Sequence, residues 1–137
     1  MEIGRLQSFF AGQRKVRLAY LFGSYGKGTE GPLSDIDIAV FLKNNLSKHD
    51  RQETQLELLG EISSIVNTDR LDLVVMNDCP VELNYEIIKH GKILNVKDEG
   101  ERVDLESMIL SRYLDRRYYE QRSLNSFLER VIEKGGL

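Results

Sequence analysis

The chain has little of several features that mark particular classes of protein. Cys79 is its single cysteine, so no disulfide can form within the chain, and a reducing cytoplasm is the expected compartment. No apolar run approaches the roughly 20 residues that a membrane-spanning helix needs. The segment from Met1 to Phe10 lacks the basic-then-apolar order of a secretory signal. The sequence therefore predicts neither a membrane protein nor a disulfide-stabilised secreted domain.

Net charge is also small. The 19 Lys and Arg residues against 22 Asp and Glu residues give a net charge of −3 at pH 7. Proteins that coat nucleic acid are usually basic, so we expect no direct nucleic-acid binding. A nucleotide held through metal ions at an acidic site is compatible with this balance. Hydrophobic residues make up 41% of the chain and charged residues 30%, which is typical of a folded chain.

No internal repeat, low-complexity tract or Pro/Gly/Ser linker divides the 137 residues, whose length fits a single domain, 1–137. Hydrophobic periodicity predicts strands that alternate with helices, and hence a mixed α/β (α+β) fold. The expected strands cover residues 16–22, 35–42, 71–76 and 92–96. The expected helices cover residues 3–12, 47–66, 80–90 and 103–133, the last as one long helix or two shorter ones. We expect a core of about residues 1–97 and a C-terminal helical segment of about residues 102–134.

The expected helix 47–66 has a cap and an apolar face that can be predicted individually. Ser47 is a favourable N-cap residue, because its hydroxyl can accept a hydrogen bond from the first turn. Helical spacing predicts an apolar stripe that faces the core. Its expected members are Leu56, Leu59, Ile62, Ile65 and Val66.

Two acidic residues begin the expected strand 35–42. Asp35 and Asp37 are two residues apart, so their side chains share one face of the strand. Carboxylates this close repel each other unless a cation lies between them. Ligation by oxygen alone suits Mg²⁺ or Mn²⁺ better than zinc. This pair is therefore a candidate metal site.

A third carboxylate lies in the expected strand 71–76. Asp72 alternates with the apolar residues Leu71 and Leu73, so it faces the other way. If this strand lies beside strand 35–42, three carboxylates meet on one face of the sheet. Three carboxylates suffice to hold two metal ions for phosphoryl or nucleotidyl transfer. Asp69 is a nearby competitor, but it lies in the preceding turn, where Asp is ordinary.

A glycine-rich turn, residues 23–34, precedes these carboxylates. Gly23 lets the backbone turn sharply and approach a ligand closely. Ser24 offers a hydroxyl and a backbone N–H, and Lys27 offers a positive charge. Together they predict a site for the terminal phosphates of a nucleotide.

Two better-known phosphate motifs match this turn only in spacing. Segment 26–31 has the glycine spacing of a dinucleotide-binding loop, but Pro32 and then a strand follow it, where that motif opens a helix. Segment 23–28 has the glycine spacing of a Walker A loop. Thr29 and Glu30 follow it, where that motif requires Lys and then Ser or Thr. We interpret both matches as chance.

The sequence Gly23-Ser24, ten residues and then Asp35-x-Asp37 resembles the signature of the DNA polymerase β-like nucleotidyltransferase superfamily. More closely, it resembles the minimal nucleotidyltransferase (MNT) group, which is often encoded beside a HEPN-domain protein as a toxin–antitoxin pair. The resemblance implies a small mixed sheet with helices packed mainly on one side. Many members have Arg where this chain has Lys27, which keeps the charge without the bidentate geometry.

The resemblance also implies a role for each matching residue. Gly23 and Ser24 would bind the β- and γ-phosphates of ATP. Asp35 and Asp37 would ligate both metal ions, Mg²⁺ or Mn²⁺. Asp72 would ligate the catalytic metal and help to activate the acceptor hydroxyl.

The activity that the resemblance implies is transfer of AMP from ATP to a tyrosine hydroxyl of a HEPN RNase toxin, by its antitoxin. Two alternatives stay open. One is a non-catalytic antitoxin that sequesters its partner, and the other is a nucleotidyltransferase for small cationic acceptors, such as aminoglycosides. The segment from Arg112 to Arg122 has two interpretations of equal weight, a solvated helix face and a partner surface.

Overall fold

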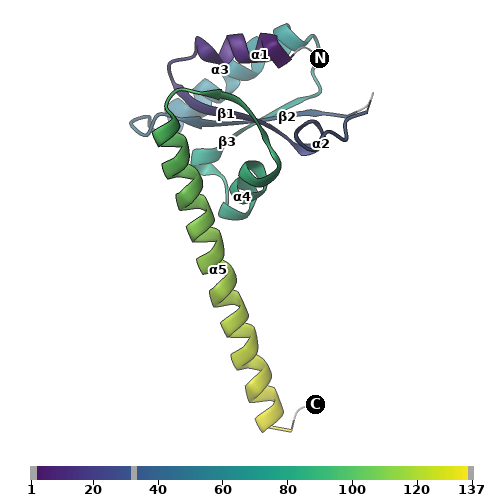
Figure 1. The fold of residues 1–137 in the computed structure, drawn as a ribbon, viewed down its shortest axis with the longest axis vertical. Helices are drawn as coiled ribbons and strands as arrows, with labels where there is room; N and C mark the ends of the chain where they lie inside the picture. Colours follow the sequence, from purple (N-terminus) through teal and green to yellow (C-terminus); the bar gives the residue numbers. More distant parts are fainter. Residues whose placement is uncertain (1–2, 32–33, 136–137) are drawn as a thin grey trace.

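The computed structural model describes residues 3–31 and 34–135, so Pro32 in the glycine-rich turn lies outside the described residues. Figure 1 shows a sheet with helices above and below it, and one long helix that runs away from it. The strands are β1 (Val16–Phe22), β2 (Ile36–Leu42), β3 (Leu71–Val75) and β4 (Lys92–Val96). The α-helices are α1 (Ile3–Ala11), α2 (Gly23–Lys27), α3 (Lys48–Val66), α4 (Val81–His90) and α5 (Glu99–Glu133), and a 3₁₀ turn, η1, covers Met76–Asp78.

The sheet is mixed, as the resemblance implies. Its strand order is β3-β2-β1-β4. Strand β1 is antiparallel to both of its neighbours, β2 and β4, whereas β2 and β3 are parallel. The parallel pair is connected through α3, which supplies the long crossover that parallel strands require.

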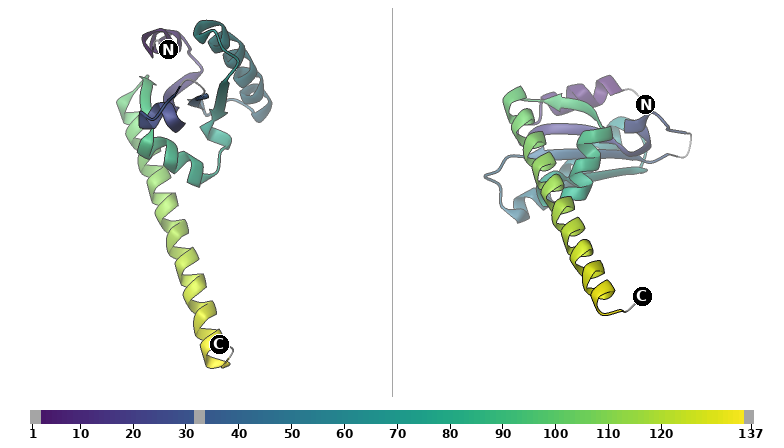
Figure 2. Two further views of the ribbon diagram at one scale, coloured as in Figure 1. Left: turned by 90° about the vertical axis from the view of Figure 1, so that its right-hand side faces the viewer. Right: turned by 60° about the horizontal axis from the view of Figure 1, so that its bottom comes forward.

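Helices cover both faces of the sheet (Figure 2). Helices α1 and α3 pack on one face through Leu6, Phe10, Leu58 and Ile62. Helix α4 and the first turns of α5 pack on the other through Ile87, Leu105 and Ile109. The expectation that helices pack mainly on one side is wrong in that detail. Strand β2 places Ile38 on one face and Ala39 on the other, both fully buried, so both faces need cover.

Helix α3 is capped as predicted, since the Ser47 hydroxyl accepts a hydrogen bond from the backbone N–H of Asp50. Its predicted stripe is only partly right. Ile62 is buried, but Leu56 is 73% exposed. The buried positions are Thr54, Leu58 and Ile62, which are spaced four residues apart. A polar residue can occupy the first of these positions because the Thr54 hydroxyl donates a 2.8 Å hydrogen bond to the Asp50 carbonyl.

Helix α5 is one continuous helix of 35 residues. Its beginning is held to β1 by a hydrogen bond of 3.1 Å from the Tyr20 hydroxyl to Glu106, and by an ion pair between Arg17 and Glu101. Beyond this region we call residues 112–133 the arm. Every residue from 114 to 130 is exposed. Within the described residues, no helix combines the length and apolar character needed to cross a membrane.

Candidate active site

The turn from β1 into α2 is built around Gly23. Its φ of +64° lies in the left-handed region, which favours glycine. A Cβ at this position would overlap the carboxylate of Asp37, whose Cγ would lie only 3.1 Å away. The backbone of the turn therefore lies directly against a carboxylate of the neighbouring strand, and only glycine allows this approach.

The glycine-rich segment contains a short helix where the sequence predicts only a turn. Helix α2 ends at Gly28, which has a φ of +75°, and the N–H of Thr29 donates a 2.8 Å hydrogen bond to the carbonyl of Ser24. Gly26 is buried, and a Cβ there would lie 3.3 Å from the carbonyl oxygen of His90. Helix α2 is thus held between β1 and the end of α4. This holds Ser24 in its first turn and leaves Lys27 exposed in its last.

The three carboxylates singled out in the sequence come to the same end of the sheet. Asp37 of β2 is the direct register partner of Asp72 of β3, so the condition stated above, that these two strands lie side by side, is met. Asp35 precedes β2 by one residue. Asp35 and Asp72 are exposed and Asp37 is half-buried. Asp37 also pairs with Phe22, the last residue before Gly23, which joins the carboxylates to the α2 turn.

Electrostatics single out Asp37. Partial burial raises the pKa of its carboxyl above the ordinary value, and the nearby carboxylates of Asp72 and Asp35 raise it further. This is the response expected of a partly buried carboxyl beside two other carboxylates. A divalent cation among them would remove the repulsion, and oxygen donors are the ligands that Mg²⁺ and Mn²⁺ prefer.

The donor set fits such an ion chemically, but it is not closed around one. Within residues 3–31 and 34–135, no three Asp, Glu, His or Cys side chains are already gathered as a metal site. Asp35 and Asp72 are exposed, so their side chains have the freedom to turn toward Asp37 when an ion binds. The strands therefore place the ligands, and the ion would complete their arrangement.

A cleft of about 420 Å³ opens beside the carboxylates. It is lined by Asp35, Asp69, Arg70, Leu71 and Asp72. Sequence reasoning assigned Asp69 to an ordinary turn and did not consider Arg70. The only signal for them was their place just before β3, and the cleft arises because the N–H of Ile36 bonds to the carbonyl of Arg70 and brings the two strand starts together.

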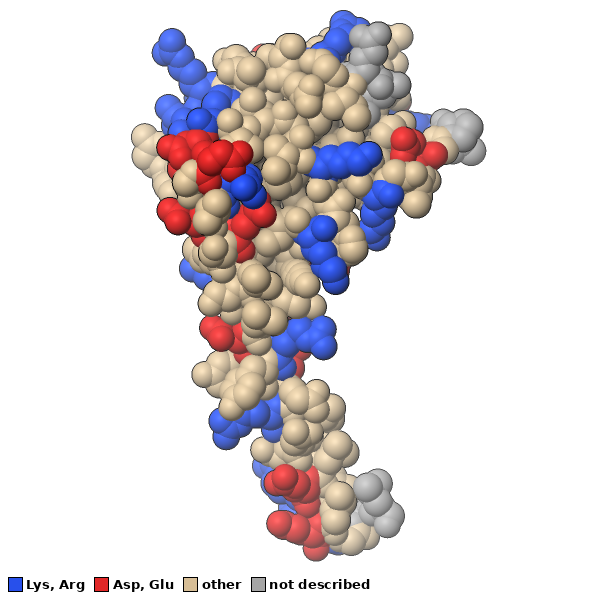
Figure 3. Space-filling view, in the orientation of Figure 1, with Lys and Arg blue, Asp and Glu red and all other residues tan. Residues whose placement is uncertain are grey.

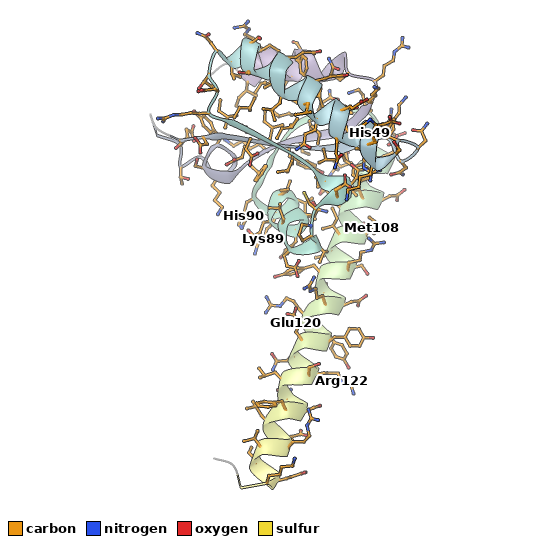
Figure 4. The ribbon with its side chains drawn as sticks, turned by 180° about the vertical axis from the view of Figure 1, so that it is seen from behind. His49, Lys89, His90, Met108, Glu120 and Arg122 are labelled. Atoms are coloured by element: carbon orange, nitrogen blue, oxygen red, sulfur yellow. The ribbon has the colours of Figure 1, made fainter. Side chains whose placement is uncertain are left out.

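Basic side chains lie around α2 on the face shown in Figure 3. Lys27 is in the last turn of α2. Lys89 and His90 lie together at the end of α4, against which α2 packs (Figure 4). A polyphosphate beside α2 would thus have cations on one side and the carboxylate site on the other, which is the charge arrangement that a metal-bound nucleotide needs.

Comparisons with known proteins agree with this geometry. The protein adenylyltransferase MntA of Shewanella oneidensis (strain MR-1) is 38% identical over 80 residues, which are 58% of this chain and 54% of that protein. The matched stretch thus spans about half the length of that relative.

Solved structures resemble the fold over nearly the whole chain. A crystal structure of a toxin–antitoxin with AMP-PNP matches with a TM-score of 0.71 and 25% identity. The match covers 93% of this chain and 99% of the chain in that structure. The structure of a tri-AMPylated Shewanella oneidensis HEPN toxin in complex with an MNT antitoxin has a TM-score of 0.65 and 22% identity, with the same coverage, and supports the fold.

The family model described as "Polymerase beta, Nucleotidyltransferase" matches residues 5–100. This stretch is more than half of the chain and contains the α2 turn, the carboxylates and the whole sheet. The chain therefore belongs to the polymerase beta nucleotidyltransferase family.

Proposed function

We propose that this chain is a metal-dependent nucleotidyltransferase that transfers AMP from ATP to a tyrosine hydroxyl of a HEPN-domain RNase toxin, and is thereby the toxin's antitoxin. The observation that carries the proposal is the placement of Asp37 beside Asp72 on one side and against Gly23 on the other. The 38% identity to a protein adenylyltransferase supports the choice of reaction.

Each residue of the site has a role in this proposal. Asp35, Asp37 and Asp72 would hold Mg²⁺ or Mn²⁺. When bound, the metal lowers the pKa of the acceptor hydroxyl and offsets charge on the phosphates. The backbone N–H groups of Gly23 and Ser24, and the hydroxyl of Ser24, bind the β- and γ-phosphates of ATP.

The two sides of the site have separate substrates. Lys27, on the α2 side, neutralises phosphate charge. Asp72 lies on β3, an edge strand of the sheet, and is exposed to the cleft. The acceptor hydroxyl enters from this open side, next to Asp72, whereas ATP lies against α2.

The acceptor is presented by a partner. The cleft beside Asp72 is shallow and open, and it offers few groups that would enclose a small molecule. Related structures are complexes of a toxin with its antitoxin, one of them with AMP-PNP. The reaction takes place in the cytoplasm, where ATP is available, and residues 1–137 act as one nucleotidyltransferase domain.

Intact-mass measurement tests the proposal. The chain is incubated with Mg²⁺, ATP and its co-purified HEPN toxin, beside an Asp35→Asn/Asp37→Asn variant and an Asp104→Asn control on α5. We expect a gain of about 329 Da on the toxin for each AMP transferred. The wild type and the control should show this gain, and the double variant should not.

Other outcomes favour the alternatives. A double variant that modifies the toxin normally would contradict the carboxylate mechanism. A double variant that modifies nothing but still neutralises the toxin would favour sequestration. Transfer of AMP to an aminoglycoside in the absence of toxin would favour a small-molecule acceptor.

A further inference from the structure

The arm of α5 exposes a row of large apolar side chains. Leu124, Phe127, Leu128 and Ile132 are between 41% and 66% exposed. Nearer the sheet, Leu110 and Leu114 are 45% and 55% exposed. Scattered apolar residues on a surface need no explanation, but a contiguous apolar patch marks an interaction site.

The apolar side chains from Leu124 to Ile132 form one continuous stripe rather than a scatter. Leu124, Leu128 and Ile132 are four residues apart, and Phe127 and Val131 fill the intervening positions of the same face. Arg122 lies on the other side of the helix, away from α4 (Figure 4). The arm is thus amphipathic, and every one of its residues from 114 to 130 is exposed. A helix of this kind is stabilised by burying its apolar face against a partner.

The stripe leads into a corner between the arm and α4. A groove of about 380 Å³ is lined there by Glu82 of α4 and, on α5, by Tyr113, Arg116, Arg117, Glu120, Gln121 and Leu124. Arg116 holds the corner together, because its guanidinium contacts Glu82 at 2.8 Å and Glu120 at 3.2 Å. The arm therefore leaves the sheet in a defined direction.

The corner lies on the side of α5 where α4 and the candidate active site also lie. Figures 1 and 2 both place α2 and α4 on the same side of α5. The end of α4 packs against α2 through Gly26 and His90. A protein seated on the stripe and in the corner would extend past α4 toward α2 and the carboxylates.

The stripe is a poor match for a second copy of itself. Arg117 lies on the same face between Leu114 and Leu124, where it stacks on Tyr113 with 5.8 Å between guanidinium carbon and ring centre. It has no carboxylate in ion-pair contact among the described residues. A parallel pair of arms would place two Arg117 side chains face to face. An antiparallel pair aligned over the whole arm would set Arg117 against Leu128. Both arrangements bury a charge without a counter-charge.

A different helical protein with an acidic or polar group opposite Arg117 avoids this cost. The arm is also retained in related complexes. The toxin–antitoxin structure with AMP-PNP matches 93% of this chain, which leaves about ten residues unmatched, fewer than half of the arm. More than half of this exposed helix is therefore also present in a protein that binds a toxin. Contact with the toxin gives its exposed apolar face a role.

We propose that the apolar stripe of the arm, with the corner beneath α4, is the surface that binds the HEPN toxin and seats its acceptor beside the carboxylates. This inference rests on the toxin being the partner in the proposed function. Apart from Glu82, it assigns partner binding to residues outside the family match, which ends at residue 100. Binding and catalysis thus reside in separate parts of the chain.

Affinity measurements with charge-matched variants test the inference. Leu124→Glu/Leu128→Glu places two carboxylates in the stripe, and Ser111→Glu/Ser126→Glu places two on the opposite face of the same helix. Each variant is titrated with the purified HEPN toxin and, separately, with AMP-PNP and Mg²⁺. Circular dichroism compares their helix content, and light scattering measures the mass of the chain alone.

We expect the stripe variant to bind the toxin at least about tenfold more weakly than wild type, and the opposite-face variant to bind as wild type does. Both should bind AMP-PNP normally. Unchanged toxin affinity in the stripe variant would overturn the inference while leaving the proposed reaction intact. If the wild type is a dimer and the stripe variant is a monomer, the stripe binds a second copy of this chain instead. If the wild type binds AMP-PNP but not the toxin, both the stripe inference and the proposed partner are wrong.

Discussion

Gly23 and Asp37 touch across the turn between β1 and β2, with no room for a side chain between them. This contact ties the phosphate side of the candidate site to its carboxylate side. It predicts that Gly23→Ala is harmful for two reasons, a positive φ and an overlap with the Asp37 carboxylate.

Gly23→Ala should therefore lose AMP transfer by at least about tenfold and lose about 1 kcal/mol or more of unfolding free energy. Toxin-modification rates and urea denaturation measure the two effects. Gly60→Ala is the control, because Gly60 lies in α3 and an added Cβ there would have nothing within 4 Å, so the change should be neutral or stabilising. Normal transfer in Gly23→Ala would show that the close approach has no function.

Asp72 should be essential for transfer although it is exposed. Asp72→Asn removes one negative charge from the register pair with Asp37, and we expect transfer to fall at least about 100-fold. Asp72 is exposed and accepts no hydrogen bond from the described residues, so the Asp72→Asn variant should unfold at a temperature close to that of wild type. Activity equal to wild type would remove Asp72 from the proposed metal site.

Magnesium should stabilise the free chain. Burial raises the pKa of Asp37, and repulsion from Asp72 and Asp35 raises it further; a bound cation would relieve that repulsion. At ten times its dissociation constant, Mg²⁺ should add about 1.4 kcal/mol to the unfolding free energy. Thermal denaturation with increasing MgCl₂, at constant ionic strength, measures this gain. The gain should be absent in Asp37→Asn, and an equal gain in that variant would point to binding elsewhere.

The link between α3 and η1 should weaken in acid. Arg51 donates hydrogen bonds of 2.9 and 2.7 Å to Asp78, and this interaction lowers the pKa of the Asp78 carboxyl. A lowered folded-state pKa gives stability that is present above the unfolded value, near 3.9, and is lost as the pH falls through the folded value.

Asp78→Asn should accordingly be less stable than wild type at pH 7, and the difference should shrink as the pH falls below about 4. Urea denaturation across this range measures it. A difference that stays constant with pH would mean that the ionised carboxylate is not its source.

Tyr20 should anchor the beginning of α5. Its side chain is 2% exposed, and its hydroxyl donates a 3.1 Å hydrogen bond to Glu106. Tyr20→Phe should lower the unfolding free energy by about 1 kcal/mol, as urea denaturation would measure. Tyr118→Phe on the arm, where the ring is 56% exposed, should change it little. Equal effects would mean that the buried hydrogen bond adds nothing.

Local patterns in the sequence were sufficient for much of this molecule. Alternating apolar residues located β1 and β2, and with them the position of Asp35 and Asp37 at the beginning of β2. The Ser47 cap was also predictable, since it depends on a hydroxyl and a backbone N–H three residues away. Such features involve neighbours along the chain, so no knowledge of distant segments is needed.

Features that depend on contacts between distant segments were decided by the tertiary structure. Asp72 lies opposite Asp37 only because α3 brings the chain back so that β3 pairs with β2 in parallel. The α2 helix formed inside a glycine-rich turn because the end of α4 packs against Gly26. Thr54 took a core position that apolar spacing assigned to Leu56, and helices came to cover both faces of the sheet. Periodicity shows which face of an element is apolar, but which segment packs against that face, or whether the chain leaves it exposed as on the arm, depends on how the whole chain folds back on itself.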